Sequence, residues 1–339
     1  MNHHPAICSR RSLLAAGAAL ALAARLRPAA AQDATPAASG WTFVDGAGDT
    51  ISLPAMPERV VAYLPLAAAL WDYGVRPAGI FGAATRPDGT PEVYAGDVDL
   101  ASVVNIGETY GELDLERLIE LDPDLFVNDM WAHPPDIWGL DEDAQAQLRT
   151  ITPIAQILYV EQPVTDTIAS LEILAGLLGA DLDDPEVVAE KAAFEQASAE
   201  LKAAIDEKPG LKVLVMSGTP DTGLYVSSPR QSADLIYFQE LGLEMVEPEN
   251  TTEFNYWEEL SWEQAGKYPV DLFLIDSRQW SSTGEQLVAS VPTFAALPAA
   301  RARQFAGWDI EYVPSYKGFT PVLQRLTEAI RNADPDIVP

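Results

Sequence analysis

Short apolar runs alternate with longer amphipathic stretches along most of the chain. The pattern opens with a predicted hairpin, in which Trp41–Val44 and Thr50–Leu53 flank a turn. Strand-like and helix-like stretches then follow one another: we expect strands at 59–64, 103–106, 125–127 and 154–158, and a first helix at 67–73. Such alternation is typical of a mostly parallel sheet with helices on its faces.

One long amphipathic segment interrupts this rhythm. Between Pro185 and Ile205, apolar residues recur at helical spacing, and Pro209-Gly210 follows. Afterwards the alternation resumes, with strands expected at 212–216 and 272–275 and helices at 233–241 and 321–330. We therefore predict an α/β fold of two lobes with mostly parallel central sheets and flanking helices. The expected parts are a first lobe over 41–184, one long interlobe helix over 185–207 and a second lobe over 208–339.

The two halves share a repeated pattern. Residues 113–116 and 124–126 align without a gap on residues 260–263 and 271–273, and each matched pair is 147 residues apart. Each copy predicts a helix start, one or two helical turns, and a strand that begins at the second acid. The repeat supports two lobes of related construction.

The first 31 residues are typical of an export signal. Arg10-Arg11 precedes an apolar stretch at 13–24, and small residues follow at 28–31. The paired arginines indicate the twin-arginine route, and the apolar stretch is shorter than the roughly 20 residues of a membrane-spanning helix. Residues 32–40 are rich in Ala, Pro, Thr and Ser and predict a flexible linker. Cys8 precedes the apolar stretch, so we expect no lipid anchor.

The charge balance excludes several functions. The chain has 21 Lys and Arg against 51 Asp and Glu, and loss of residues 1–31 would remove four arginines and no acid, leaving a net charge of −34. Such a protein does not bind nucleic acid or anionic membranes through its general field. Of three histidines only His133 would remain, which is too few for a site that binds a bare metal ion. We expect neither a bound metal nor a cofactor.

Five segments in order resemble the periplasmic binding proteins for iron siderophores, haem and cobalamin. They are residues 45–61, residues 70–79, the two copies of the repeat, and residues 294–301 before Trp308. The resemblance covers nearly all of residues 41–333. It implies a monomeric, periplasmic substrate-binding protein that captures an iron chelate, a ferric siderophore above all, and delivers it to an ABC importer. Haem and cobalamin remain open as cargo within the same fold.

The resemblance also assigns a role to two acids of the repeat. In this family an acidic residue at the tip of each lobe docks onto arginines of the membrane permease, and the matching residues are Glu116 and Glu263. Carboxylate–arginine pairs on separate lobes can hold both lobes at one angle. Each glutamate also follows an N-cap candidate, Asp114 or Ser261, where an acid favours a helix start.

Cargo-binding candidates are the aromatic and basic residues just past the strands. In open α/β sheets ligands bind at the loops beyond the carboxyl ends of the strands, and in a two-lobed protein those loops face a cleft. Iron chelates combine flat apolar faces with anionic oxygens, which aromatic side chains and arginines suit. The candidates are Tyr63, Arg86, Trp131 and His133 on the first lobe, and Tyr225, Arg230, Arg278, Trp280 and Trp308 on the second. Packing aromatics and solvated surface arginines are the alternative interpretation.

An exported α/β hydrolase is the alternative from another class. The chain has no Gly-x-Ser-x-Gly elbow, and Met216-Ser217-Gly218 lacks the first glycine of that motif. Phosphate-loop and dinucleotide fingerprints are also absent from the sequence. We therefore expect a binding protein and not an enzyme.

Overall fold

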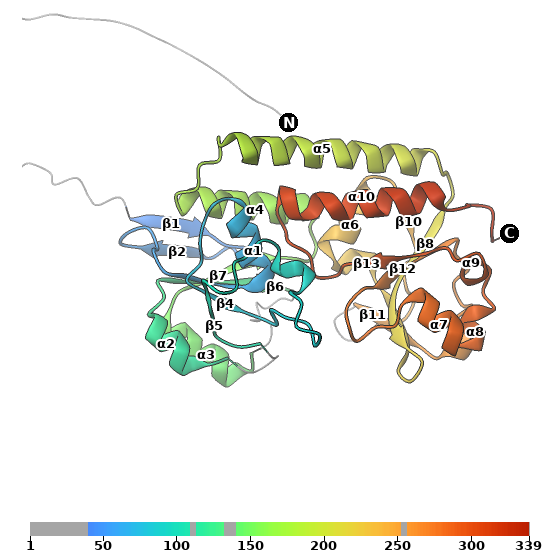
Figure 1. The fold of residues 1–339 in the computed structure, drawn as a ribbon, viewed down its shortest axis with the longest axis horizontal. Helices are drawn as coiled ribbons and strands as arrows, with labels where there is room; N and C mark the ends of the chain where they lie inside the picture. Colours follow the sequence, from blue (N-terminus) through green and yellow to red (C-terminus); the bar gives the residue numbers. More distant parts are fainter. Residues whose placement is uncertain (1–39, 109–112, 132–139, 252–255, 339) are drawn as a thin grey trace, which may run out of the picture. The chain divides into compact units, whose positions relative to one another are not determined.

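The computed structural model describes residues 40–108, 113–131, 140–251 and 256–338. Residues 38–339 form one compact unit, which contains two α/β lobes (Figure 1). The signal peptide and nearly all of the linker predicted for 1–40 lie outside the described residues, as does His133. In the part of the chain that the structure describes, no helix is both long enough and apolar enough to span a bilayer.

The first lobe is built on a parallel sheet with the strand order β5-β4-β3-β6-β7. Its strands are β3 (Val60–Tyr63), β4 (Gly79–Phe81), β5 (Val104–Asn105), β6 (Leu125–Met130) and β7 (Ile154–Leu158), preceded by the predicted hairpin of β1 (Trp41–Val44) and β2 (Thr50–Leu53). The helices are α1 (Leu64–Asp72), η1 (Val93–Ala95), α2 (Leu115–Leu121), α3 (Glu142–Ile151) and α4 (Val164–Leu177). Every residue of β3 and β6 is buried, as expected for central strands covered on both faces.

The second lobe has a mixed sheet with the order β11-β9-β8-β12-β13, and β10 also pairs with β8. The strands are β8 (Lys212–Thr219), β9 (Gly223–Ser227), β10 (Glu244–Met245), β11 (Trp257–Leu260), β12 (Leu272–Asp276) and β13 (Phe305–Trp308). The helices are η2 (Pro229–Gln231), α6 (Ala233–Glu240), η3 (Trp262–Gln264), α7 (Gly284–Ser290), α8 (Pro292–Ala295) and α9 (Pro298–Arg301). Strand β9 runs antiparallel to both of its neighbours, whereas β8, β12 and β13 are parallel.

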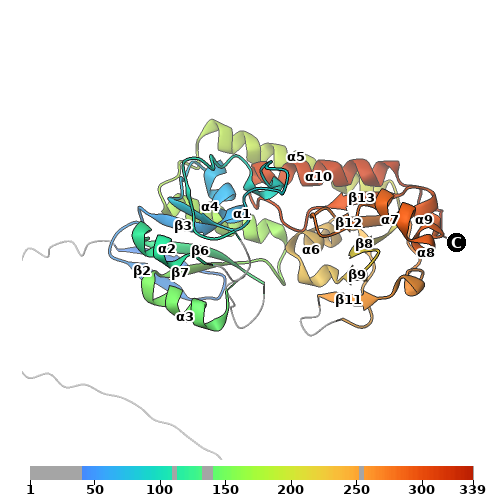
Figure 2. The same ribbon diagram turned by 60° about the horizontal axis from the view of Figure 1, so that its bottom comes forward.

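Two helices join the lobes. Helix α5 (Pro185–Asp206) is the predicted interlobe helix, and its N-cap Asp184 accepts a hydrogen bond from the backbone of Glu186 at 2.8 Å. Helix α10 (Tyr316–Asn332) packs along α5, and the two lie side by side in both views (Figures 1 and 2). The first turn of α10 contacts the first lobe, because Lys317 pairs with Asp97 at 2.9 Å. Two helices therefore restrict movement between the lobes more than the single predicted interlobe helix would.

The start of α10 differs from the prediction. We expected Pro321 to open this helix, but the helix begins at Tyr316 and includes Pro321. Ser315 provides the N-cap, since its hydroxyl accepts a hydrogen bond from the backbone of Gly318 at 2.9 Å. A proline inside a helix leaves only one carbonyl without its usual partner, and the buried face of α10 packs well enough to tolerate that loss.

Alternation of side chains divides the apolar core of the second lobe into two layers. Val213 and Val215 of β8 face a cluster that continues through α5, α6 and α10 into the first lobe. Leu214 and Met216 of the same strand face a separate cluster under η3, α7, α8 and α9. This period of two is that of a strand covered on both faces. The first cluster makes α5 and α10 part of the core of both lobes.

The internal repeat corresponds to one arrangement built twice. In the first lobe the backbone of Asp124 donates to Arg59 at 2.9 Å, and its carboxylate accepts from the backbone of Arg59 at 2.8 Å. In the second lobe Asp271 makes the same two contacts with Lys212, at 2.9 and 3.0 Å. Each acid ties the beginning of one central strand to the beginning of its neighbour. Residues 147 apart in the chain therefore occupy equivalent positions in the two sheets.

Candidate functional site

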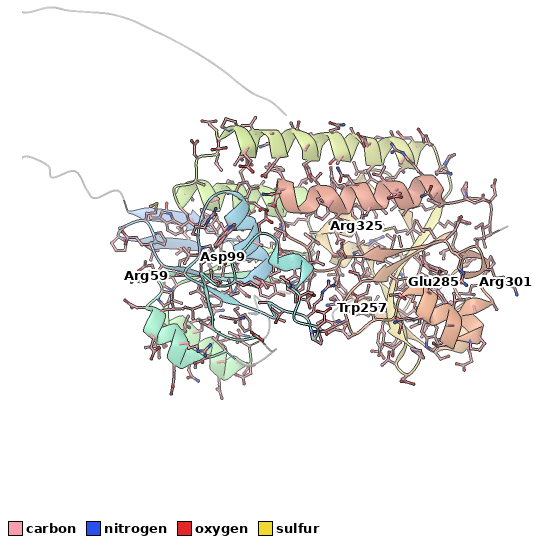
Figure 3. The ribbon with its side chains drawn as sticks, viewed as in Figure 1. Arg59, Asp99, Trp257, Glu285, Arg301 and Arg325 are labelled. Carbon is pink, nitrogen blue, oxygen red and sulfur yellow. The ribbon has the colours of Figure 1, made fainter. Side chains whose placement is uncertain are left out.

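A cavity of about 130 Å³ lies between the lobes at the carboxyl ends of the central strands. It is lined by Tyr63, Asp129 and Trp131 of the first lobe, by Tyr256, Trp257 and Arg278 of the second, and by Ile310 and Glu311 of the segment that leads from β13 to α10. Trp257 is labelled in Figure 3, where the two lobes meet. The position is the one that parallel α/β sheets use for ligands.

The first-lobe wall comes from the ends of two adjacent strands. Tyr63 is the last residue of β3, and Asp129 is the fifth residue of β6. Asp129 is only 2% exposed. Its Oδ2 accepts a hydrogen bond from the indole nitrogen of Trp131, whereas its Oδ1 has no hydrogen-bond partner among the described residues. Asp129 thus lines the cavity and has one buried carboxylate oxygen that no described residue satisfies.

The second-lobe wall is organised around Arg278, two residues after the end of β12. Its Nε lies 3.0 Å and its Nη2 2.8 Å from the carboxylate oxygens of Asp276, whose side chain is fully buried. Nη1 of Arg278 reaches Glu311 at 3.5 Å. The guanidinium is thus held in a fork-like pair with one acid and lies beside another. Its charge is already balanced by the protein.

Aromatic rings connect the two walls. The ring of Trp131 lies 5.2 Å from that of Tyr159 and 6.2 Å from that of Tyr256 across the cavity. Tyr256 in turn lies 4.9 Å from Trp257. Such edge and tilted contacts stabilise aromatic clusters and give the cavity apolar, shaped sides. Flat apolar groups of a ligand would pack here.

Burial changes the acid–base properties of the cavity. Burial raises the pKa of Asp129 to about 7, with the hydrogen bond from Trp131 acting in the opposite direction and the charge of Glu311 adding to the rise. Burial also raises the pKa of Glu311, although the charge of Arg278 opposes this. Both acids are disfavoured as anions because burial removes water from their carboxylates.

The other predicted binding residues lie around this cavity or away from it. Trp308 is buried behind Trp257, with ring centres 6.1 Å apart, and donates to Asp234 at 2.7 Å. The ring of Tyr225 lies edge-on to that of Trp257, with ring centres 6.4 Å apart. Trp280 is 54% exposed and lies 5.1 Å from the guanidinium of Arg278. Trp308 and Tyr225 thus support the cavity wall, and Trp280 covers the outer side of Arg278.

Two predicted arginines are paired with acids outside the cavity lining. Arg86 lies 3.1 Å from Glu92, and the exposed Arg230 lies 3.3 Å from Glu247. Their roles in cargo binding stay predictions, as does that of His133, which is outside the described residues.

Sequence reasoning missed five residues of the wall: Asp129, Tyr256, Trp257, Ile310 and Glu311. The predicted candidates are aromatic and basic residues near the ends of strands, whereas Trp257 opens a strand and Glu311 lies in a loop before a helix. One signal was available for Asp129. An acid inside an apolar strand run is unusual, and Asp129 is the repeat counterpart of Asp276, 147 residues on.

The proposed docking acids lie at helix starts. Glu116 is in the first turn of α2 and is exposed; Glu263 is in the first turn of η3 and is also exposed. A helix between two parallel strands runs opposite to them, so the first turn of α2 lies at the cleft end of the first lobe. Trp262, next to Glu263, donates to Thr219 at the carboxyl end of β8 at 3.0 Å. Both acids therefore lie at the cleft end of their lobe.

Larger hollows lie elsewhere on the protein. One of about 630 Å³ lies between β13 and α10, and another of about 400 Å³ lies where α1 meets the beginning of α5. Neither is lined by residues of both strand-end walls. Within the described ranges, no group of three or more His, Cys, Asp or Glu side chains is placed to hold a metal ion.

The sequence profile of the periplasmic binding protein family matches residues 61–312, which is most of the chain. The chain therefore belongs to this family, whose members are binding proteins, and the hydrolase alternative has no support. Among curated proteins, none matches the chain.

Solved structures of siderophore-binding proteins share its fold. DesE, a ferric-siderophore receptor protein from Streptomyces coelicolor, is 35% identical, with a TM-score of 0.81 over 88% of this chain and 100% of that chain. The petrobactin-binding protein YclQ from Bacillus subtilis is 15% identical, with a TM-score of 0.65 over 86% and 99% of the two chains. The catecholate-siderophore binding protein VctP from Vibrio cholerae is 16% identical, with a TM-score of 0.60 over 86% and 99%. The last two likenesses concern the fold alone.

Proposed function

We propose that this protein captures a ferric siderophore between its lobes, outside the cytoplasm, and delivers it to an ABC importer. The observation that carries this proposal is the cavity itself. Its walls come from strand ends of both lobes, and aromatic rings of Trp131, Tyr256 and Trp257 face it. The similarity to DesE, a ferric-siderophore receptor that matches over its entire length, supports an iron chelate as the cargo.

The size of the cavity adds a condition. Pockets for drug-sized ligands span about 300 to 1,000 Å³, and this cavity has about 130 Å³. A ferric chelate therefore requires the walls to move apart. Helices α5 and α10 brace the lobes together, so we expect a small hinge or loop movement and not a wide closure.

Fluorescence titration tests the proposal. The purified protein is titrated with ferric trihydroxamate, ferric tricatecholate, haem, cobalamin, the iron-free chelators and zinc. We expect at least one ferric siderophore to quench tryptophan emission with saturation, because Trp131 and Trp257 line the cavity. Replacement of Trp131 by Phe should reduce the quench, whereas replacement of Trp41, buried in the β1 hairpin, should not. Saturable binding of zinc alone, or chemical turnover of a cargo, would contradict the proposal.

Export through the twin-arginine route is part of the same proposal, supported by the arginine pair before a short apolar stretch. Replacing Arg10 and Arg11 together with lysine should leave the precursor inside the cell. Fractionation with immunodetection measures this, and a single replacement of Arg25 serves as the control. Normal export of the double variant would show that another route carries the protein.

A further inference from the structure

The internal repeat makes Asp129 and Asp276 equivalent. Each is the fifth residue of its strand, β6 or β12, and 147 residues separate them. Each is 2% exposed. Each accepts a hydrogen bond from the side chain two residues further on, which is Trp131 in the first lobe and Arg278 in the second. The same backbone position thus carries the same acid with two different partners.

The partner determines whether the buried charge is balanced. Arg278 gives Asp276 a full positive charge and contacts both of its oxygens, at 3.0 and 2.8 Å. Trp131 gives Asp129 one neutral donor, and Oδ1 of Asp129 has no partner in the described part of the chain. A buried acceptor without a donor costs free energy that a native structure retains only for a reason.

The surroundings of Asp129 add negative charge. Glu311 also lines the cavity, and among the described lining residues Arg278 is the only cation. Arg278 is itself engaged by Asp276 and Glu311, so it leaves Asp129 unbalanced. Among the described residues, therefore, no positively charged side chain pairs with Asp129.

We propose that Asp129 recognises a protonated amine of the cargo, so that the protein prefers iron chelates with a free ammonium group to neutral or anionic chelates. This inference rests on the proposed function and specifies its cargo. An ammonium group has three donors and one positive charge. It can satisfy Oδ1 of Asp129 and offset the charge of Glu311, while the iron-binding part of the chelate packs against the aromatic rings.

A matched series of chelates tests this inference. Three ferric trihydroxamates share one iron-binding cage and differ only in a pendant group: a free amine, its acetamide and its succinamide with a terminal carboxylate. The measured quantity is the ratio of the affinity for the ammonium chelate to the affinity for the acetamide chelate, at constant ionic strength. Charge-assisted hydrogen bonds favour the ammonium form by roughly 10-fold to 100-fold. The carboxylate chelate should bind most weakly.

Variants separate the local acid from the overall negative charge. Asp129→Asn keeps an acceptor for Trp131 and should lower the ratio to near 1, and Glu311→Gln should lower it partly. Glu285→Gln is the control, because this substitution removes the same charge at a distance from the cavity. Glu285 is on α7, at the far end of the second lobe from Trp257 (Figure 3). The control should keep the wild-type affinity ratio. A general effect of protein charge would instead change the affinity ratio equally in all three variants.

Each outcome decides between the two proposals. Binding of all three chelates with equal affinity, or a ratio that survives Asp129→Asn in a folded variant, would overturn the inference and leave the proposed function standing. Tighter binding of a ferric tricatecholate than of the ammonium chelate would do the same. If no ferric siderophore, haem or cobalamin binds at all, the proposed function fails and this inference fails with it. Thermal denaturation of each variant establishes that it is folded.

Discussion

In the second lobe Arg278 holds the buried Asp276 with contacts of 3.0 and 2.8 Å. In the first lobe the equivalent Asp129 accepts, from the described side chains, one hydrogen bond, which Trp131 donates. Asp276 is thereby a structural acid that fixes Arg278 beside Glu311. Asp129 lines the cavity, and its Oδ1 has no hydrogen-bond partner in the part of the chain that the structure describes. The difference suggests that one copy of the repeat serves stability and the other retains an unfavourable charge for binding, as functional sites often do.

Removing the positive charge of Arg278 in the second lobe should have the largest effect on the free energy of unfolding. Arg278→Ala leaves Asp276 buried without a cation and Glu311 without its neighbour. Removing one member of a buried ion pair costs about 3 to 5 kcal/mol of unfolding free energy. Chemical denaturation at neutral pH measures this.

The matched control for Arg278 is the exposed Arg301→Ala on the same lobe, which should change the unfolding free energy little. Adding Asp276→Asn to Arg278→Ala should restore part of the loss. Should the double variant be no more stable than the single one, Arg278 does not act by balancing Asp276.

Variants of Glu116 and Glu263 test whether the two lobes contribute equivalently to docking on the permease. Glu116→Ala with Glu263→Ala should leave cargo affinity nearly unchanged, because both acids are exposed at helix starts and lie outside the cavity lining. Loss of a carboxylate–arginine pair at an interface costs about 2 to 5 kcal/mol, roughly 30-fold to several thousand-fold in affinity for the permease. Uptake of labelled ferric chelate by cells with the cognate importer measures this.

The control for the docking variants is Glu285→Ala, an exposed glutamate of α7 that should transport normally. Unimpaired uptake by the double variant, or a collapse of cargo affinity in either single variant, would remove the docking role. Glu116 and Glu263 would then be acids that favour helix starts and nothing more.

The smallest expected effect concerns the stability of the empty protein. The pKa of Asp129 is raised by burial from 3.8 to about 7, so between these values the folded protein binds a proton that the unfolded chain has released. Ionisation of the buried Asp129 therefore lowers the free energy of unfolding progressively as pH rises through this window. The loss is complete above about pH 7. Asp129→Asn should stabilise the cargo-free protein by about 1 to 3 kcal/mol at pH 8 and by almost nothing near pH 4.

Denaturation of the Asp129→Asn variant and the wild type at several pH values measures that difference. The expected pattern is a variant that is more stable but binds an ammonium chelate more weakly. A variant that is less stable than wild type at pH 8 would mean that the Asp129 carboxylate is satisfied in the folded protein.

Most of the fold could be predicted from the sequence because its elements carry strong patterns. Continuous apolar runs located β3, β6 and β12, and a 22-residue amphipathic segment between prolines located α5. The repeat located the equivalent acids Asp124 and Asp271. The packing of α10 along α5 was not predictable, because an amphipathic pattern does not show which helix the apolar face of α10 will contact.

The candidate site was only partly predictable for a related reason. Tyr63 ends a strand, Trp131 and Arg278 follow strands, and all three line the cavity. The pairing of Arg278 with Asp276 and Glu311 was not predictable, and the role of Arg278 in cargo binding stays a prediction. Whether a charge is balanced depends on contacts between side chains, which a sequence position does not reveal.

The position of iron in crystals of the complex tests the central claim most directly. Crystals grown with a ferric siderophore that binds in solution are measured at the iron absorption edge, and the anomalous peak locates the metal without assumptions about the ligand. We predict one peak in the cavity, between the rings of Trp131 and Trp257 and within reach of residues from both lobes. A peak in the larger hollow between β13 and α10, or on the surface of one lobe, would contradict capture between the lobes.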